Sequence, residues 1–207
     1  MSTAPLRVAV LLYPGAVFFE IALATDTLAA HGVQLWWATP DGSAHAASNG
    51  ARLAADGGYA EMAARRWDAV VIPGGDPGSI VVPGSANATL HAGHAQGAVM
   101  AGICAGALVL AAAGLLRGRR ATHTYTPRYA SPEAVATTAP YWDGLLYDEA
   151  DVVVDGPFVT AKPWATVGWT GALMQRLGLW DEAAVGRLAA YHARPCAPPA
   201  DPRQSSS

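Results

Sequence analysis

Short apolar runs alternate along the chain with stretches whose apolar residues recur at helical spacing. The runs are rich in aliphatic and β-branched residues and are stopped by glycine or proline, which is typical of strands. They predict strands at 7–13, 33–39, 67–72, 98–103 and 120–125, and two more inside 152–161. The other stretches predict helices at 17–30, 87–96, 105–113, 165–177 and 182–193, with a helical turn at 131–138. Strands that are apolar throughout indicate a mostly parallel sheet covered on both faces, so we expect an α/β fold.

Two local patterns refine this reading. Ser48-Asn49-Gly50 lies between short segments within 44–55 and predicts a hairpin. Trp36 and Trp37 are neighbours on a predicted strand, so their side chains must pack on opposite faces of the sheet.

No repeat or linker divides the body of the chain, and we expect one domain over 1–194. The segment 195–207 is rich in proline and serine and is predicted to be a disordered tail. The apolar run near the N-terminus, about eight residues, is too short to span a bilayer and lacks the basic flank of a signal peptide. We therefore expect a cytoplasmic protein without a membrane partner.

Composition narrows the function classes. Of 207 residues 52% are hydrophobic and 14% charged, which excludes disorder for most of the chain. A net charge of −3 without a long basic run argues against a nucleic-acid partner. Low charge together with seven tryptophans suggests that part of the surface is covered in a homodimer. The two cysteines, Cys104 and Cys196, cannot form a disulfide framework.

Cys104 stands in the pattern Gly102-Ile103-Cys104-Ala105-Gly106, between a predicted strand and a predicted helix. This is the arrangement of a nucleophile elbow, in which a tight turn exposes the side chain above the sheet. The helix N-terminus favours the thiolate over the thiol. The alternative is a small cysteine buried in the core.

Two further features are expected near this cysteine. Pro73-Gly74-Gly75 follows a predicted strand, and an N–H of Gly74 or Gly75 paired with that of Ala105 would form an oxyanion hole; the alternative is an ordinary turn. Glu20 lies in an apolar run after the first strand, either on a solvated helix face or buried with a partner. A buried, protonated Glu20 would donate a hydrogen bond to a thiolate.

These residues resemble a family. VVIPGG, followed by GICAGALVLAAAGLLRGRRAT and by VVVDGPFVTA, is similar to the ThiJ/PfpI superfamily, the group of the parkinsonism-associated deglycase, which is related to class I glutamine amidotransferases. The resemblance runs from about residue 7 to residue 177. It implies a flavodoxin-like three-layer sandwich, usually a homodimer. It also implies Cys104 as nucleophile, Glu20 as its hydrogen-bonding acid, and Gly75 with Ala105 as oxyanion donors.

The chain departs from several branches of that superfamily. Ala105 stands where peptidase-like members place histidine directly after the cysteine. Isocyanide hydratases resemble the segment LVLAAAGLLRGRRAT but typically carry aspartate at the position of Glu20 and threonine at that of Ala105. The late histidine with a following acid that amidotransferases need is absent at Tyr191-His192-Ala193-Arg194.

A histidine that many members of the superfamily share lies one position earlier in this chain. Many relatives read ATTH, whereas this chain reads Ala121-Thr122-His123-Thr124, one residue early. In a strand this shift turns the side chain to the opposite face. Either a bulge brings His123 to Cys104, where it would act as a base, or Thr124 occupies that place; we expect His123.

The remaining candidates are weaker. Trp164 follows a strand end and either lines the substrate pocket, with Gly74 and Thr124, or packs in the core or an interface. His91 and His94 have ligand spacing on a helix, but no cysteine or carboxylate cluster accompanies them, so we expect no metal site. No phosphate loop or dinucleotide fingerprint is present, and we expect no cofactor.

The leading hypothesis is a cofactor-free enzyme of the ThiJ/PfpI type, a hydro-lyase or hydrolase acting on a small molecule. Its Cys104 thiolate would attack an electrophilic carbon, that of an α-oxoaldehyde, as in a glyoxalase or deglycase, or that of an isonitrile, as in a hydratase. A redox sensor or stress chaperone that acts through reversible oxidation of Cys104 is the alternative. A third hypothesis is a non-catalytic scaffold that serves only to form the dimer.

Overall fold

The computed structural model describes residues 4–194. Seven strands form one sheet in the order β10-β11-β7-β6-β1-β2-β5, and every neighbouring pair is parallel except β10 with β11. The strands are β1 (Arg7–Leu11), β2 (Gln34–Thr39), β5 (Gly57–Gly58), β6 (Ala69–Ile72), β7 (Val99–Ile103), β10 (Val152–Asp155) and β11 (Phe158–Ala161).

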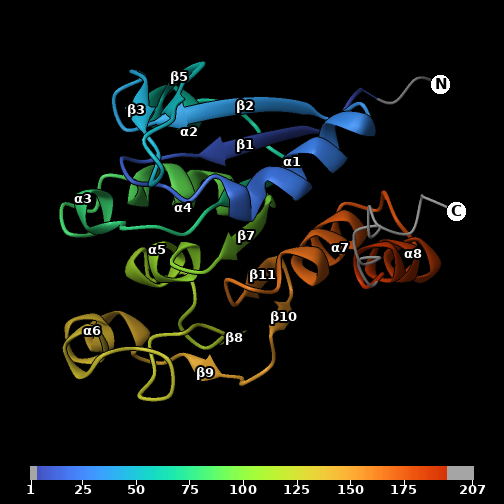
Figure 1. Cartoon of the computed structure of the whole chain (residues 1–207). Helices are drawn as coiled ribbons and strands as arrows, with labels where there is room; N and C mark the ends of the chain where they lie inside the picture. Colours follow the sequence, from blue (N-terminus) through green and yellow to red (C-terminus); the bar gives the residue numbers. More distant parts are fainter. Residues whose placement is uncertain (1–3, 195–207) are drawn as a thin grey trace, which may run out of the picture.

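Helices cover both faces of this sheet and make a three-layer sandwich (Figure 1). One face is covered by α1 (Phe19–Ala30) and α7 (Thr166–Arg176), and α8 (Glu182–His192) packs on the outside of α7. The other face is covered by α2 (Tyr59–Ala63), α4 (Asn87–Ala95) and α5 (Gly106–Ala112).

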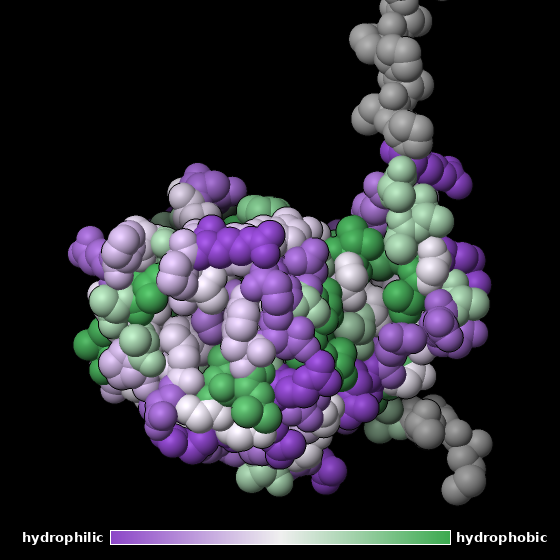
Figure 2. Space-filling model, turned by 90° about the horizontal axis from the view of Figure 1, so that it is seen from below, coloured by the Kyte–Doolittle hydropathy of each residue, from purple (hydrophilic) through white to green (hydrophobic). Residues whose placement is uncertain are grey.

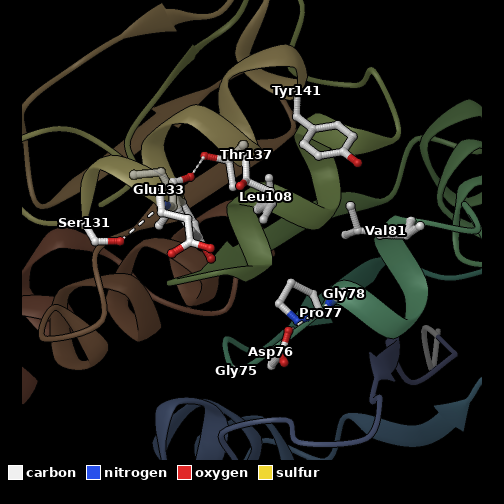
Figure 3. A pocket seen from close by; sticks show the side chains of 14 residues that line it. Gly75, Asp76, Pro77, Gly78, Val81, Leu108, Ser131, Glu133, Thr137 and Tyr141 are labelled. Carbon is white, nitrogen blue, oxygen red and sulfur yellow. Dashed lines mark hydrogen bonds between the residues drawn. The ribbon is translucent and has the colours of Figure 1, made fainter.

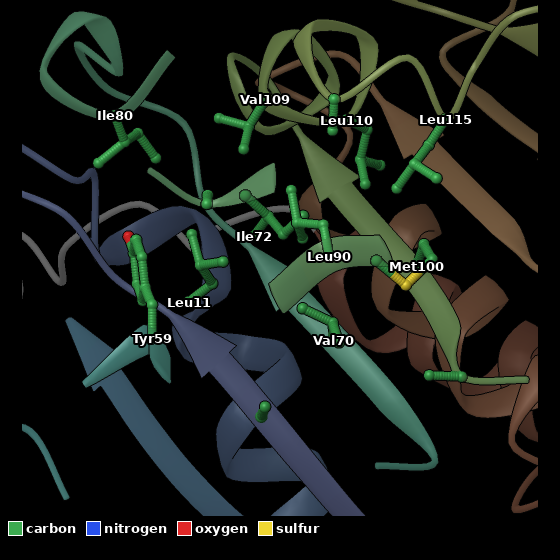
Figure 4. Close-up of a cluster of buried hydrophobic side chains, with 14 of the residues drawn as sticks. Leu11, Tyr59, Val70, Ile72, Ile80, Leu90, Met100, Val109, Leu110 and Leu115 are labelled. Atoms are coloured by element: carbon green, nitrogen blue, oxygen red, sulfur yellow. The ribbon is translucent and has the colours of Figure 1, made fainter. Parts of the chain in front are cut away.

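Strand alternation divides the core between the two faces. In β1, Val8 and Val10 pack toward α1 and α7, whereas Ala9 and Leu11 pack toward α2, α4 and α5. Figure 4 shows the second of these clusters, in which Leu11, Ile72 and Met100 project from three adjacent strands. Because side chains of successive residues point to opposite faces, a strand buried on both faces must be apolar throughout, as the sequence pattern indicated.

Shorter elements lie at the ends and edges of the sheet. The hairpin pairs β3 (His45–Ala46) with β4 (Arg52–Leu53), and α3 (Gly78–Val81) follows β6. The segment 122–151 contains α6 (Pro132–Thr138), the 3-10 helix η1 (Ala139–Trp142) and β9 (Leu146–Tyr147), which pairs with β8 (Arg120–Ala121). From the side that carries α6, β8 and β9, the surface is mixed, with hydrophobic residues in several places among polar ones (Figure 2).

The predicted α/β class with a mostly parallel central sheet is confirmed. The hairpin within 44–55 is confirmed, as are opposite packing faces for Trp36 and Trp37. The strand predicted at 120–125 is wrong beyond Ala121, because the chain leaves the sheet there and enters an irregular loop. The predicted tail 195–207 lies outside the described residues, and within 4–194 no helix has the length and apolarity to cross a membrane.

Candidate active site

Cys104 sits at the turn between β7 and α5, where an elbow was predicted. Its φ is +56°, and no other non-glycine residue among 4–194 has a positive φ. An L-residue in this left-handed region is strained by about 1–2 kcal/mol. Its N–H donates to the carbonyl of Ala161 on the adjacent strand at 2.8 Å, which ties the turn to the sheet. The backbone is therefore held in a conformation that presents the half-buried sulfur at the sheet's edge.

The glycines around Cys104 are required by close backbone approach. A Cβ at Gly106 would lie 2.2 Å from the carbonyl oxygen of Ile72, and one at Gly102 would lie 2.8 Å from the carbonyl carbon of Gly106. Since these neighbours are backbone atoms, they cannot move aside. The G-x-C-x-G spacing is thus explained by the packing of α5 against the ends of β6 and β7.

Glu20 is buried with a partner rather than placed on a solvated face. It lies in the first turn of α1, is only 3% exposed, and its carboxyl group is hydrogen-bonded to the side chain of Cys104. The N–H of Gly74 donates to Glu20 Oε2 at 2.8 Å, and the N–H of Val17 donates to the carbonyl of Gly74 at 2.9 Å. This pair of bonds fixes the start of α1 against the end of β6.

Gly74 leaves no room for a side chain. A Cβ there would lie 2.4 Å from Glu20 Oε2 and 2.6 Å from Cys104 Sγ. The residue follows β6, Glu20 follows β1, and Cys104 follows β7, so the three converge at the carboxyl end of adjacent strands. In the sheet, β1 lies between β2 and β6, so the strand order changes direction at β1. Open α/β sheets form their binding crevice at such a point.

The acid–base character of the pair follows from burial and mutual charge. Burial, followed by the charge of Glu20, raises the pKa of Cys104 to about 12. Hydrogen bonds from the N–H groups of Ala105 and Gly75 act in the opposite direction and lower this pKa. Burial also raises the pKa of Glu20, against the lowering effect of its bonds with Cys104 and Gly74.

These opposing effects couple the two groups through one proton. When the proton sits on Glu20, the carboxylate charge that raises the Cys104 pKa is removed and the carboxyl group donates to the sulfur. The thiolate formed in this way also accepts from the N–H groups of Gly75 and Ala105. The arrangement can therefore hold a thiolate beside a carboxylic acid, or a thiol beside a carboxylate.

His123 does not take the place expected for it. Its ring stacks on Trp142, with centroids 3.8 Å apart, and its Nδ1 accepts from the N–H of Tyr125 at 3.1 Å. Burial lowers its pKa to about 4. The Cys104 sulfur is hydrogen-bonded to Glu20, Gly75 and Ala105. The pKa of His123 is lowered by burial, with no contribution from Cys104. The expected choice between two strand faces does not arise, because no strand extends to residue 123.

Tyr125 is the side chain of this loop that faces the site, and the sequence argument did not single it out. Burial raises its pKa to about 12, with further increases from the charges of Cys104, Asp76 and Glu20. Its phenol is consequently a hydrogen-bond donor at neutral pH. An aromatic residue two positions after His123 was the available signal, but its meaning depended on where the loop turns.

A cavity of about 470 Å³ opens at Gly75, whose N–H bonds the Cys104 sulfur (Figure 3). It is walled by the start of α3, by α5, and by α6 with η1 from the 122–151 segment. The described residues that line it are Gly75, Asp76, Pro77, Gly78, Val81, Val82, Leu108, Tyr125, Ser131, Glu133, Ala134, Thr137, Thr138 and Tyr141.

The three predicted pocket residues do not line this cavity. Gly74 is buried behind it and bonds Glu20, and Thr124 is half-buried outside it. Trp164 is 54% exposed and packs against Tyr129, with ring centroids 5.4 Å apart. The cavity instead takes most of its walls from helices whose role no sequence motif marked.

Of the weaker candidates, His91 is exposed and His94 half-buried on α4. His94 lies beside Phe158, with ring centroids 5.1 Å apart, and within 4–194 no group of three or more His, Cys, Asp or Glu side chains is arranged to hold a metal ion. Cys196 lies outside the described residues.

Comparisons with known proteins identify the family of the chain. Residues 6–175 match the model of the DJ-1/PfpI family. The chain is 28% identical over 190 residues to protein dj-1beta of Drosophila melanogaster, covering 88% of this chain and 97% of that one. It is 36% identical over 137 residues to an uncharacterized protein in the cpoL 5' region of Streptomyces lividans, covering 61% of this chain and 95% of that one.

Solved structures give the same result. A DJ-1 superfamily protein from Agrobacterium tumefaciens aligns with a TM-score of 0.75 and 27% identity over 91% of this chain and 98% of that one. The family match spans the strands and helices that carry Glu20, Gly74 and Cys104. On the strength of that match, the chain belongs to the DJ-1/PfpI family.

Proposed function

We propose that the protein is a cofactor-free enzyme in which the Cys104 thiolate attacks the electrophilic carbon of a small molecule. The observation that carries this proposal is the setting of the sulfur. It is held on a strained turn, bonded to the buried carboxyl of Glu20 and to two backbone N–H groups, and placed next to a cavity. Strained backbone and a perturbed titratable pair beside a cavity favour a reactive role over a packing role.

Cys104 supplies the attacking electron pair in the proposed reaction, and Glu20 supplies and recovers the proton. The thiolate electron pair forms a C–S bond to the carbonyl carbon of an α-oxoaldehyde, or to the terminal carbon of an isonitrile. In the aldehyde the displaced π pair goes to the carbonyl oxygen, which takes the proton of Glu20. In the isonitrile it goes to nitrogen, and the lone pair left on carbon takes that proton, giving a thioimidate. The N–H groups of Gly75 and Ala105 stabilise the negative charge as it develops.

For the α-oxoaldehyde, the Glu20 carboxylate then takes the proton from the carbon bonded to sulfur, forming an enediolate, and gives it to the neighbouring carbon. The aldehyde carbon is thereby oxidised to a thioester and the ketone carbon reduced to an alcohol. Water cleaves this thioester to a 2-hydroxy acid, or adds to the thioimidate from the isonitrile to release a formamide. In both cases the sulfur leaves as the thiolate and a proton returns to Glu20.

Turnover of methylglyoxal to lactate and of cyclohexyl isonitrile to its formamide tests this proposal. We expect one of these reactions to be catalysed by the full chain and lost by at least about 1,000-fold in Cys104→Ser and Cys104→Ala. Cys196→Ser is the matched control and is expected to keep wild-type turnover. Full turnover by Cys104→Ser would contradict the proposal.

A redox role for the same cysteine is the second candidate, and the carboxyl of Glu20 beside the sulfur favours it. A protonated carboxyl and two N–H donors would stabilise a sulfinate formed on Cys104. Mass spectrometry after mild peroxide decides between the roles. Selective oxidation of Cys104 in a protein that turns over neither substrate supports the sensor, whereas turnover lost in Cys104→Ser supports the enzyme.

A further inference from the structure

The cavity meets the cysteine through its neighbours, since Cys104 itself is not among the described lining residues. Gly75 joins the two, because its N–H bonds the sulfur while the residue itself lines the cavity. Tyr125 also lines the cavity, and its phenol lies near enough to Cys104 and Asp76 to feel the charge of both. Under the proposed function, a substrate bound in this cavity lies next to the group that bonds the sulfur.

The charged groups of the cavity wall are of one sign. Asp76 stands in the loop before α3 and Glu133 in the first turn of α6, on two different walls (Figure 3). No lysine, arginine or histidine is among the lining residues that the structure describes. Neither carboxylate forms an ion pair with a described side chain.

The rest of the wall is apolar or carries hydroxyl groups. Apolar surface comes from Pro77, Val81, Val82 and Leu108. Hydroxyl groups come from several lining residues, one of which is Tyr125. Both carboxylates are exposed, so water and salt weaken their field, but they are the charged groups on the described cavity wall. An anion that enters meets repulsion from both walls, whereas a neutral apolar molecule gains contact area.

We infer that Cys104 acts on an uncharged electrophile with an apolar body, and that Asp76 and Glu133 discriminate against electrophiles that carry a negative charge. This inference rests on the proposed function and narrows its substrate class. Among aldehydes with an adjacent carbonyl group, we expect the site to prefer one with a neutral alkyl or aryl substituent over one that carries a carboxylate.

Three methanethiosulfonates of different charge test the inference: the methyl reagent is neutral, the sulfonatoethyl reagent anionic and the trimethylammonioethyl reagent cationic. Each transfers its alkylthio group to a thiolate, forming an S–S bond and releasing methanesulfinate. Second-order rates are measured on the full chain carrying Cys196→Ser, so that Cys104 is the one remaining thiol. Dividing them by the rates for free 2-mercaptoethanol removes the intrinsic reactivity of each reagent.

The decisive quantity is the anionic-to-neutral rate ratio in variants of the cavity wall, because Glu20 also repels an anion. We expect Glu133→Gln and Asp76→Asn each to raise this ratio roughly two- to fivefold at low ionic strength, the size typical of partly exposed charges. The cationic-to-neutral ratio should fall by a similar factor, and 1 M salt should weaken both changes. Glu182→Gln, on α8 and away from the cavity, is the matched control and should change neither ratio.

Unchanged ratios in both cavity variants would overturn the inference while leaving the nucleophile proposal standing. Failure of all three reagents to modify Cys104 would overturn the proposed function and the inference with it. Asp76 also accepts a hydrogen bond from the N–H of Gly78 at 3.2 Å, which asparagine can still accept, and Glu133 is exposed, so both variants should fold.

Discussion

Cys104 and Glu20 work as one chemical unit, because neither side chain has its properties without the other. Burial alone would hold the thiol protonated, and the charge of an ionised Glu20 raises the pKa of Cys104 further. Under the proposed function, the thiolate forms when the shared proton moves to the carboxyl group. Under the proposed function, Glu20 supplies this proton and Cys104 supplies the electron pair.

Glu20→Gln separates proton donation from hydrogen bonding. The amide still donates a hydrogen bond to the sulfur but cannot give up a proton in the reaction, so turnover should fall by about 100-fold or more. Alkylation of Cys104 by iodoacetamide at pH 7, which needs no such proton, should stay within about tenfold of the wild-type rate. A parallel loss of turnover and alkylation would show that Glu20 only positions the cysteine.

Gly74→Ala tests the close approach of Glu20 and Cys104. The new Cβ would overlap both side chains, at 2.4 Å and 2.6 Å, and must push them apart. We expect turnover to fall by about 100-fold or more, with a loss of stability of about 1–3 kcal/mol from overpacking. Gly186→Ala in α8 is the control, since a Cβ there meets nothing within 4 Å and alanine should stabilise the helix by up to about 1 kcal/mol. Equal behaviour of the two variants in turnover and chemical denaturation would contradict this account.

Among the elements, the 122–151 segment builds one wall of the cavity without belonging to the main sheet. Lys162, directly after β11, ties it down with a side chain that is only 2% exposed. Its Nζ bonds Glu149 Oε1 at 2.9 Å and also the backbone carbonyl of that residue. The hydroxyls of Tyr129 and Tyr147 donate to the same carboxylate at 2.6 and 2.7 Å. One buried cation therefore organises a loop of some thirty residues.

Lys162→Met should release this segment. Removing the buried ammonium leaves the carbonyl and carboxylate of Glu149 without their partner, and we expect the free energy of unfolding to fall by about 2 kcal/mol. Limited proteolysis should cut first within 122–151. Arg117→Met, which breaks an exposed ion pair with Asp143 in the same region, is the matched control and should cost less than about 0.5 kcal/mol. Equal losses in urea denaturation would exclude the anchoring role of Lys162.

His123 makes the stability of this segment depend on pH. Its pKa is lowered from 6.5 to about 4 in the folded protein, so between these values the unfolded chain binds the extra proton. The contribution of the neutral ring is present above pH 6.5 and is lost as the pH falls toward 4. We expect a loss on the order of 2 kcal/mol between pH 7 and 4.5.

His123→Phe keeps the stack on Trp142 and removes the titration. Urea denaturation at pH 7 and at pH 4.5 should show that the difference in stability between wild type and variant changes in this window. Other groups, including Glu20 with its raised pKa, contribute equally to both proteins. A constant difference at the two pH values would contradict the assignment.

At the scale of the whole molecule, the parallel sheet is what brings the site together. Glu20, Gly74 and Cys104 are separated by about fifty and thirty residues, yet each follows a strand that ends at the same edge. The sheet order β7-β6-β1 makes them neighbours. The site thus depends on the registry of three strands, and damage to any of them should affect it.

The surface leaves several large hydrophobic side chains exposed, and we expect the protein to form a homodimer that covers part of them. They are Phe19, Val82, Leu146, Tyr147, Val154, Trp164 and Tyr191, exposed by 40–80%. Sedimentation equilibrium should give a mass of twice 21.3 kDa at micromolar concentration. A mass of 21.3 kDa across that range would contradict the dimer.

Much of the fold could be predicted from local pattern. A strand buried on both faces must be apolar along its whole length, and this constraint is visible in runs such as 67–72 and 98–103. The sequence pattern did not predict β5, α2 and α3, because elements of two to five residues are too short to show a repeat of hydrophobic positions. The strand predicted at 120–125 was wrong because a β-favouring run is also compatible with a loop that packs aromatic rings.

The sequence alone determined the elbow of Cys104. A tight strand-to-helix turn requires small residues at fixed spacing, and this requirement is met within the five residues 102–106. Only the tertiary structure decided that Glu20 is buried against the sulfur, that His123 stacks on Trp142, and that Tyr125 faces the cavity. These outcomes depend on contacts between segments far apart in the chain. Such contacts follow from strand order and loop path, which no local spacing encodes.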